Sequence, residues 1–223
     1  LFWKLMPINV SPVSFLIRDK CYSIISCSPE TLLLKKGDLI KTKPIAGTLR
    51  KTKKINHNKA LAFFRRNEKE TKEHNMIVDM ERNDLSKICK TGSVKIDKLK
   101  TVEEYRDLFH YVTTIKGVLK NKITNHDIIS SLMPGGSVIG CPKISTIQLL
   151  NQKEKSDRNI YTGSFGIIHS NGDMRFNIMI RTLLNFKNAI ELSVASGVIL
   201  GSTAKKEYNE NYIKAKSLLD LFN

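Results

Sequence analysis

Pairs of glutamates on two predicted helices are the first feature of this sequence that could carry chemistry. Glu70 and Glu73 stand three residues apart in a helical pattern, and Glu207 and Glu210 repeat the spacing near the end of the chain. Such a pair lies on one helix face, with Cβ atoms about 5–6 Å apart. Four carboxylates brought together from two helices would bind a hard divalent cation, and Mg²⁺ suits an all-oxygen set of ligands. The alternative is that all four are solvated surface charges beside lysines.

Three further polar residues stand in settings that suggest a function. His110 lies among apolar residues, which is the setting either of a hydrogen-bonded core histidine or of a catalytic one. Arg181 interrupts an apolar strand pattern, and a buried guanidinium needs an anion, which a substrate carboxylate or an internal acid would supply. Lys214 follows Glu210 by four residues and therefore shares its helix face, where it either binds an anion or neutralises the glutamates.

The elements that must position these residues follow from hydrophobic periodicity and turn signals. Short apolar runs predict strands over residues 14–17, 22–26, 31–34, 38–41, 161–169, 175–184 and 189–194, with turns at 36–38, 171–173 and 187–188. Helical periodicity predicts helices over 58–87, 144–151 and 204–221, while 103–114 is expected to begin as a helical turn and continue as a strand. Grouped strands separated by helices are typical of an α+β fold with mainly antiparallel sheets. We expect a single domain over residues 1–223.

Composition limits the classes of protein that the chain can represent. Its 223 residues are 41% hydrophobic and 26% charged, which argues against disorder, and no apolar run is long enough to span a membrane. Four widely separated cysteines predict neither a zinc site nor a disulfide scaffold, so we expect a cytoplasmic protein. The net charge of +16 comes mostly from dispersed lysines, and the densest run, 51–54, has no nearby aromatic residue. We therefore expect no nucleic-acid partner and no membrane partner, although the charge would steer an anionic substrate.

Nine sequence features occur in order along the chain: SPE (28–30), KPIAGT (43–48), KEHNMIVDMERNDLS (72–86), GSV (92–94), His110, PGGSVIGCPK (134–143), YTGSFG (161–166), FNIMIRTL (176–183) and EYNENYIKAK (207–216). Together they resemble the chorismate-utilising enzyme family, which includes anthranilate synthase component I, aminodeoxychorismate synthase component I, isochorismate synthase and salicylate synthase. The resemblance covers essentially the whole chain. Members of the family are longer, so it implies a catalytic domain whose N-terminal portion is missing from this sequence.

The resemblance implies an α/β sandwich of two mainly antiparallel sheets flanked by helices, with the active site between the sheets. It implies an Mg²⁺ ion that bridges the ring carboxylate of chorismate to Glu73 and Glu210, with Glu70 and Glu207 nearby or acting through water. The enolpyruvyl carboxylate would be held by Tyr161, Arg181 and Lys214 together with backbone amides around Ala195, Ser196 and Gly197. Glu30 matches the acid that protonates the departing C4 hydroxyl, and His110 and Thr48 match residues that hydrogen-bond near the reacting ring.

Three segments favour aminodeoxychorismate synthase component I as the most similar member: PGGS, FNIMIRTL and residues 12–14 (PVS). That resemblance implies amination of chorismate to 4-amino-4-deoxychorismate, with ammonia from a glutamine amidotransferase subunit. Ala46, in the substrate-binding segment, points the other way, because many of these enzymes carry a lysine nucleophile there. The alternative is anthranilate synthase component I, which makes anthranilate and pyruvate. The PIAGT and PGGS segments resemble isochorismate and salicylate synthases less than they resemble these two enzymes.

The sequence also departs from the family pattern. Arg175 replaces a more usual aspartate, and Ala195 and Ser196 stand in a segment that is usually richer in glycine. Side chains there could weaken the approach of backbone amides to a carboxylate. A non-catalytic, degraded paralogue is therefore the alternative from another class, although the joint presence of the acidic and basic site residues argues against it.

Overall fold

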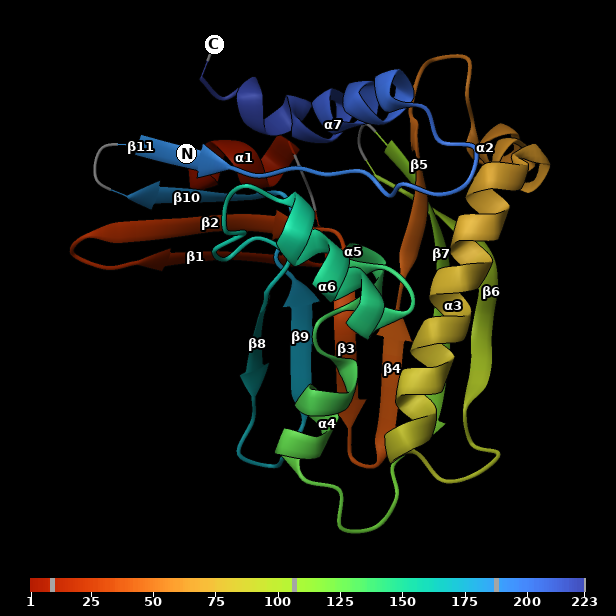
Figure 1. Cartoon of the computed structure of the whole chain (residues 1–223). Coiled ribbons are helices and arrows are strands. Elements are labelled where there is room, and N and C mark those ends of the chain that lie inside the picture. The colour runs from red at the N-terminus through yellow and green to blue at the C-terminus, as the bar shows by residue number, and fades with distance from the viewer. Residues whose placement is uncertain (9–10, 106–107, 187–188, 223) are drawn as a thin grey trace.

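The computed structural model describes residues 1–8, 11–105, 108–186 and 189–222, and its strands form two antiparallel sheets (Figure 1). The smaller sheet has the order β1-β2-β10-β11, with β1 at Val13–Arg18, β2 at Tyr22–Ser28, β10 at Thr182–Phe186 and β11 at Ala189–Leu192. The larger sheet has the order β5-β7-β4-β3-β9-β8, and β6 pairs with the other edge of β7. Its strands are β3 (Thr31–Lys36), β4 (Leu39–Lys43), β5 (Ile45–Arg50), β6 (Lys95–Glu104), β7 (Leu108–Val118), β8 (Ser164–Ile168) and β9 (Met174–Ile178).

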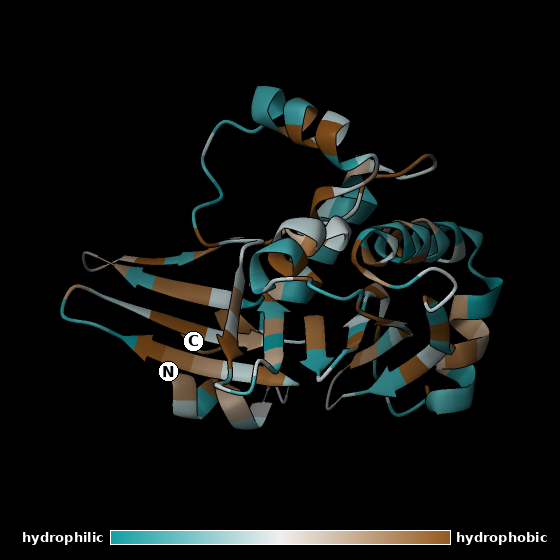
Figure 2. Cartoon of the chain, turned by 90° about the horizontal axis from the view of Figure 1, so that it is seen from below, coloured by the Kyte–Doolittle hydropathy of each residue, from teal (hydrophilic) through white to brown (hydrophobic). Residues whose placement is uncertain are grey.

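Helices flank both sheets, as expected for the predicted fold class. They are α1 (Phe2–Ile8), α2 (His57–Arg66), α3 (Glu68–Ile88), α4 (Asn125–Leu132), α5 (Gly136–Ile139), α6 (Lys143–Lys153) and α7 (Ala204–Leu219). The long helix α3 runs along the larger sheet, and α7 lies with α1 against the smaller one (Figure 1). Hydrophobic segments are concentrated on the strands of both sheets (Figure 2).

The main core lies between α3 and the larger sheet. Val78 and Leu85 of α3 pack against Leu33, Ile40 and other buried residues of the sheet. A second core joins Leu5 of α1 and Leu218 of α7 to β2 and β10. The two cores hold α3 and α7 at fixed positions relative to the sheets, and these are the helices that carry the paired glutamates.

The predicted helix over 58–87 is two helices, because Asn67 interrupts it. Asn67 has an extended backbone (φ −85°, ψ 100°) and ends α2, while its side chain accepts a hydrogen bond from the Glu70 amide at the start of α3. Asparagine competes for backbone hydrogen bonds and is a favoured N-cap. The break places Glu70 in the first turn of α3, where the helix dipole favours an acidic side chain.

The predicted strand over 175–184 is also two strands, and they belong to different sheets. β9 ends at Ile178 in the larger sheet, and β10 begins at Thr182 in the smaller one. Arg181 therefore lies in the link between the strands, not inside a strand, and has a φ of +50°. The apolar pattern continues through the link because this segment is buried while it crosses between sheets.

The remaining expectations give a mixed result. The four strands expected between residues 14 and 41 are confirmed, with a turn at 37–38, and so are the helix around 144–151 and the C-terminal helix. An expected antiparallel meander of these four strands is wrong, because β1 and β2 pair in the smaller sheet and β3 and β4 pair in the larger one. The helical turn expected at the start of 103–114 is wrong, since Glu103 and Glu104 continue β6. Tyr161 lies in a turn before β8, not in the strand. The turn predicted at 187–188 lies outside the described residues.

We expect Leu33→Ala to lower the free energy of unfolding by about 2–5 kcal/mol, because it leaves a cavity where α3 meets the sheet. Urea denaturation monitored by circular dichroism measures the loss. Leu39→Ala is the matched control on the same hairpin: Leu39 is 38% exposed, so its loss of stability is expected to be much smaller. Equal effects of the two substitutions would contradict this description of the core.

Candidate active site

Glu70, Glu73, Glu207 and Glu210 form what we call the glutamate cluster, where the first turns of α3 and α7 approach each other (Figure 1). Lys69 of α3 forms an ion pair with the buried Glu207 of α7 and so joins the two helices. Lys214 pairs with Glu210 across one turn of α7 at 2.8 Å. The structure thus brings the two pairs together, with Glu207 buried and the other three glutamates half-buried.

The cluster holds negative charge at an electrostatic cost. Burial, followed by repulsion from Glu70, raises the pKa of Glu73 to about 7. Burial and repulsion from Glu210 raise the pKa of Glu70 as well. For Glu207, burial acts in the same upward direction, but the Lys69 ion pair outweighs it and holds the pKa below its usual value. Two lysines thus face four carboxyl groups, which leaves two negative charges when all are ionised.

This charge balance fits a divalent cation held partly by the protein. Within the described ranges, no group of three or more His, Cys, Asp or Glu side chains is arranged so that it could hold a metal ion by itself. Mg²⁺ is usually bound by one or two carboxylates, and waters and substrate oxygens complete its coordination. The glutamate cluster matches that second mode, because Glu70 and Glu73 lie in a half-buried position where a cation would relieve their repulsion.

Two glycines let the backbone approach the cluster closely. A Cβ atom at Gly197 would lie 2.5 Å from Oε1 of Glu73, and one at Gly47 would lie 2.8 Å from Oε2 of Glu70. Gly47 also has a φ of +98°, which favours glycine. The loop before α7 and strand β5 are therefore both held against the carboxylates of α3.

The departures at Ala195 and Ser196 do not block this approach. The Ser196 hydroxyl donates to the Glu207 carbonyl oxygen at 3.0 Å and pairs with Oδ1 of Asn211 at 2.7 Å, so the side chain is directed to α7. Lys214 donates to the Ala195 carbonyl oxygen at 3.1 Å. The glycine that remains, Gly197, stands where a side chain would collide with Glu73.

Glu30 and Arg181 lie at the seam, which we define as the two links, 28–30 and 179–181, where the chain crosses between the sheets. The links are bonded to the neighbouring strands: the Ile178 amide donates to the Glu30 carbonyl at 3.1 Å, and the Cys27 amide donates to the Arg181 carbonyl at 3.2 Å. Ser28 Oγ also donates to the Ile178 carbonyl at 2.5 Å. The seam fixes a carboxyl group and a guanidinium group in the interior, near enough for their charges to interact.

Glu30 is set up to hold a proton near neutral pH. Only 4% of the residue is exposed, and burial raises the pKa of its carboxyl group to about 7. Ser137, the Ile45 amide, Lys214 and Arg181 all act in the opposite direction. A carboxyl group with such a pKa can donate a proton at physiological pH.

His110 is a neutral hydrogen-bond partner between Thr48 and Arg181. Its Nε2 lies 3.2 Å from the Arg181 guanidinium, which can only donate, so Nε2 accepts and the proton is on Nδ1, 3.1 Å from Thr48 Oγ1. Burial and the Arg181 charge hold the pKa of His110 well below its usual value. Both ring nitrogens thus have partners within the protein, and the guanidinium beside His110 remains a cation, with its pKa lowered by burial to about 10.

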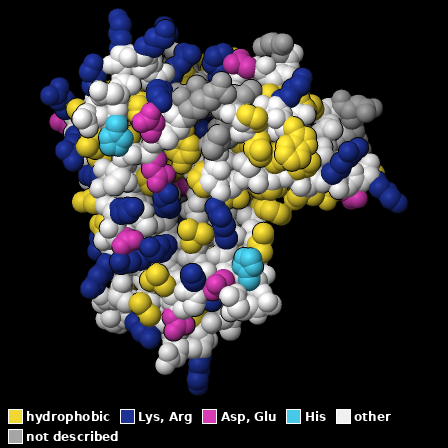
Figure 3. Space-filling model, turned by 180° about the vertical axis from the view of Figure 1, so that it is seen from behind, with side chains coloured by type: hydrophobic (Ala, Val, Ile, Leu, Met, Phe, Trp, Pro, Cys, Tyr) yellow, Lys and Arg dark blue, Asp and Glu magenta, His cyan; other side chains and the backbone are white. Residues whose placement is uncertain are grey.

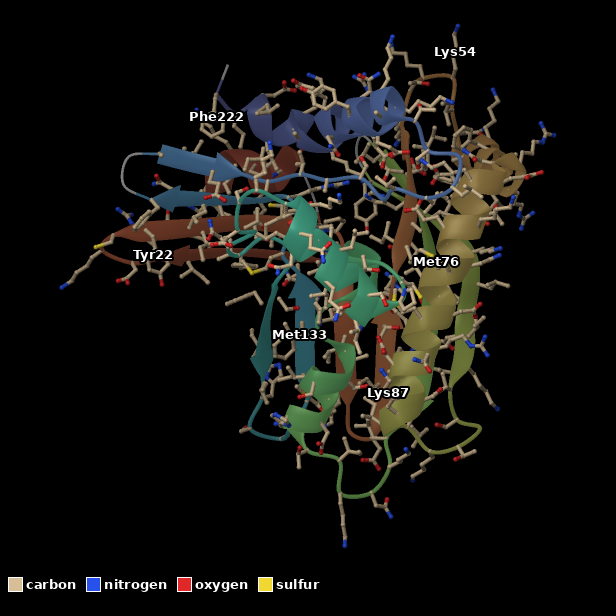
Figure 4. The ribbon with its side chains drawn as sticks, in the orientation of Figure 1. Tyr22, Lys54, Met76, Lys87, Met133 and Phe222 are labelled. Carbon is tan, nitrogen blue, oxygen red and sulfur yellow. The ribbon has the colours of Figure 1, made fainter. Side chains whose placement is uncertain are left out.

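Tyr161, Lys214 and Ala195 meet on another side of this region. Burial raises the pKa of the Tyr161 hydroxyl, while a hydrogen bond from the Ala195 amide opposes the shift. Lys214 reaches the Ala195 carbonyl and also acts electrostatically on both Glu30 and His110. The structure therefore brings the sequence-predicted polar residues into one region. The side chain of Ala46 is a buried methyl group, which packs with Ile77, Met80 and Met76. Met76 is labelled beside α3 in Figure 4.

Sequence reasoning missed Lys69 and Gly47 as parts of the site. Lys69 stands four residues before Glu73, which is the spacing of an intrahelical ion pair, but it pairs with Glu207 of the other helix. Gly47 was visible only as one letter of the KPIAGT segment, and its contact with Glu70 depends on the packing of β5 against α3. Tyr105, which faces Arg181, carried no recognisable signal.

The distribution of basic side chains on the back face does not indicate a nucleic-acid site. Lysine and arginine side chains are scattered over the back face of the molecule and are not gathered into one stripe (Figure 3). In the part of the chain that the structure describes, no helix combines the length and apolar character needed to cross a membrane.

Comparison with known proteins gives one consistent result. The chain is 38% identical over 216 residues to aminodeoxychorismate synthase component 1 of Bacillus subtilis (strain 168), covering 96% of this chain and 46% of the relative. It is 36% identical over 220 residues to anthranilate synthase component 1 1 of Haloarcula marismortui, covering 98% of this chain and 45% of that relative. The crystal structure of anthranilate synthase component I from Streptococcus pneumoniae TIGR4 superposes with a TM-score of 0.87 at 34% identity, covering 97% of this chain and 48% of that one.

The chain thus spans about half the length of the curated relatives it matches. Residues 1–220 match the family described as chorismate binding enzyme. Since that match extends over almost the whole sequence and the fold agrees with a solved relative, the chain belongs to the chorismate binding enzyme family.

Proposed function

We propose that the full-length protein is an Mg²⁺-dependent synthase that aminates chorismate to 4-amino-4-deoxychorismate. The observation that carries the proposal is Glu30, a buried carboxyl group with a pKa of about 7 that faces the charges of Arg181 and Lys214. An acid that is partly protonated at neutral pH and faces two cations suits a dianionic substrate from which a hydroxyl group must depart. Names of relatives support the same chemistry, since they include aminodeoxychorismate and anthranilate synthases.

Binding and orientation are assigned to two groups of residues. The enolpyruvyl carboxylate would contact Arg181, Tyr161 and Lys214, with the backbone at 195–197 closing around it. The ring carboxylate would lie toward Glu73 and Glu210, with Glu70 and Glu207 behind them. A bound Mg²⁺ ion would neutralise the ring carboxylate and hold the ring in register.

Proton transfer is assigned to Glu30. Hydroxide is a poor leaving group at neutral pH, so the C4 hydroxyl must receive a proton as its bond to carbon breaks. The protonated carboxyl group of Glu30 would supply it, and water would leave. His110, fixed as the neutral tautomer by Arg181, would position the Thr48 hydroxyl, and Thr48 would orient the reacting ring by hydrogen bonding.

The nitrogen source in this proposal is ammonia from a glutamine amidotransferase subunit. At position 46 a methyl group stands where many aminodeoxychorismate synthases carry a nucleophilic lysine, so ammonia would attack without a covalent enzyme intermediate. The same observation favours the second candidate, anthranilate synthase component I, in which ammonia attacks C2 and pyruvate is released. The PGGS and FNIMIRTL segments favour the first candidate.

Product analysis of the full-length protein tests the choice. The protein is incubated with chorismate, MgCl₂ and an ammonium salt, and products are separated by liquid chromatography with mass spectrometry. Aminodeoxychorismate, with its enolpyruvyl group retained, is the expected product. Anthranilate with pyruvate would establish the second candidate, and no product at pH 7–9 would favour the degraded paralogue.

Glu210→Gln is expected to lower kcat/KM by about 100-fold or more, since even outer-shell partners of a metal contribute 10–100-fold. Isothermal titration with MgCl₂ in the presence of chorismate should show loss of magnesium binding. Glu68→Gln, on α3 with its side chain 86% exposed, is the control and should leave both quantities unchanged. Activity of Glu210→Gln within a few-fold of the parent would refute its assignment as a ligand.

Glu30→Gln is expected to lower kcat by about 10²–10⁴-fold, the usual contribution of a positioned general acid. Chorismate affinity should stay within a few-fold of the parent, because glutamine preserves the shape of a protonated glutamate. Fluorescence or calorimetric titration measures the affinity, and Asp38→Asn on the exposed β3–β4 turn serves as the control. If binding is lost along with turnover, Glu30 acts in binding and its role as the acid is wrong.

A further inference from the structure

Arg158, in the loop between α6 and β8, has no part in the chemistry proposed so far, yet its side chain is closely bound. Its Nε and Nη2 atoms donate to the Glu154 carboxylate at 2.6 to 3.1 Å. Its Nη1 atom donates to the Val138 carbonyl oxygen at 3.0 Å and to the Thr162 hydroxyl at 3.3 Å. These bonds occupy four of the five N–H groups of the guanidinium. Arg158 is therefore directed at the protein and has little left to offer a ligand.

Arg158 joins three segments that are separate in the chain. Glu154 follows the last turn of α6, Val138 lies in α5, and Thr162 lies in the turn before β8. The hydrogen bonds from Arg158 hold the pKa of the Glu154 carboxyl group below its usual value, so this partner is ionised at neutral pH. A surface ion pair by itself contributes little. The bonds to the other two segments give this pair a further role, because they tie α5 to the turn that contains Thr162.

Thr162 has a backbone conformation that is unfavourable for its side chain. Its φ is +65°, in the left-handed region, where a β-branched residue is a rare outlier. Such strain persists only where surrounding contacts impose it, and it is concentrated at functional sites. Here the Thr162 amide donates to the Met179 carbonyl oxygen at 3.0 Å. The Thr162 hydroxyl accepts from Arg158 and donates to the Tyr161 carbonyl oxygen at 2.5 Å.

The same turn carries Tyr161 and is bonded to the link that carries Arg181. The Tyr161 amide donates to the Arg158 carbonyl oxygen at 2.8 Å, so both the amide and the carbonyl of Tyr161 are bound within the turn. The Met179 amide donates to the Gly163 carbonyl oxygen at 2.9 Å and joins the turn to the seam. Met179 stands two residues before Arg181, which has a left-handed φ of its own, +50°. One short stretch of backbone bonding thus positions Tyr161 and Arg181 together.

We propose that Arg158 is a positioning residue for the substrate: it holds Thr162 in its left-handed conformation and so fixes Tyr161 where the enolpyruvyl carboxylate binds. The inference rests on the proposed role of Tyr161. The ion pair with Glu154 keeps the guanidinium in place, and the bond to Val138 fixes α5 against the same turn. Arg158 acts through Tyr161 and does not contact the substrate.

Titration of the full-length protein with chorismate, in the presence of MgCl₂ and without ammonium, tests this role. Arg158→Met is expected to raise the dissociation constant about tenfold, the scale of one lost hydrogen bond to a charged group. With ammonium added, kcat at saturating chorismate should stay within a few-fold of the parent, because Glu30 and the glutamate cluster are unchanged. Arg82→Met is the matched control, since Arg82 makes one exposed ion pair with Asp79 on α3 at 3.0 Å. Unchanged affinity in a folded Arg158→Met protein would overturn the inference.

A double-mutant cycle shows whether Arg158 acts through Tyr161. Tyr161→Phe removes the hydroxyl group and is expected to weaken chorismate binding by itself. Addition of Arg158→Met should then weaken binding by no more than about twofold, because the group that Arg158 positions is already gone. A general loss of stability would instead weaken binding equally in both backgrounds. Additive losses from the two substitutions would therefore overturn the inference.

Two substitutions at Thr162 keep the test decisive if Arg158→Met does not fold. Thr162→Val preserves the shape of the side chain but removes the hydroxyl that accepts from Arg158, so binding should weaken by about tenfold. Thr162→Ser restores the hydroxyl and should recover the affinity of the parent. Melting temperatures measured by circular dichroism show that both variants fold. Equal affinities of the valine and serine variants for chorismate would overturn the inference.

The titration separates this inference from the proposed reaction, because binding without ammonium needs no turnover. A parent protein that binds chorismate but forms no product would contradict the proposed function and leave the comparison of affinities valid. A parent protein that does not bind chorismate would overturn the role of Arg158 as well, since there would be no carboxylate for Tyr161 to hold.

Discussion

Repulsion among four carboxyl groups at the first turns of α3 and α7 is the interaction around which this site is built. Burial raises the pKa values of Glu70 and Glu73, and repulsion from neighbouring glutamates raises them further. Two cores hold the helices against the sheets and so keep the charges together. Lys69 and Lys214 offset only half of the charge. The remaining negative charge is what a bound cation would offset under the proposed function.

The seam between the sheets has a different role, because it holds the Glu30 carboxyl group and the Arg181 guanidinium group in the protein interior. Strands exchange most of their backbone hydrogen bonds within one sheet, but at residues 28–30 and 179–181 the chain passes from one sheet to the other. There the two links bond to neighbouring strand ends, so the backbone remains satisfied. The side chains of Glu30 and Arg181 are left facing the interior, and neither has freedom to turn to solvent.

Buried acids recur on the inner side of the larger sheet, and their environments differ in kind. Glu73 feels the other carboxylates, Glu30 feels mostly burial offset by cations, and Glu81 feels burial and the charge of Glu30. The pKa values of three carboxyl groups of one chemical type are thus raised by different surroundings. The cations that face Glu30 also face His110, which they keep neutral.

The sequence alone determined the fold class, the two ExxE pairs and the family, because periodicity, spacing and ordered motifs are local properties that survive without coordinates. It also indicated His110 and Arg181 as polar residues in apolar surroundings. Only the tertiary structure decided that Asn67 splits a helical run, that Arg181 belongs to a link between sheets, and that Lys69 pairs across helices. Each of these depends on which distant segment packs nearby, and a periodic pattern carries no record of its partner.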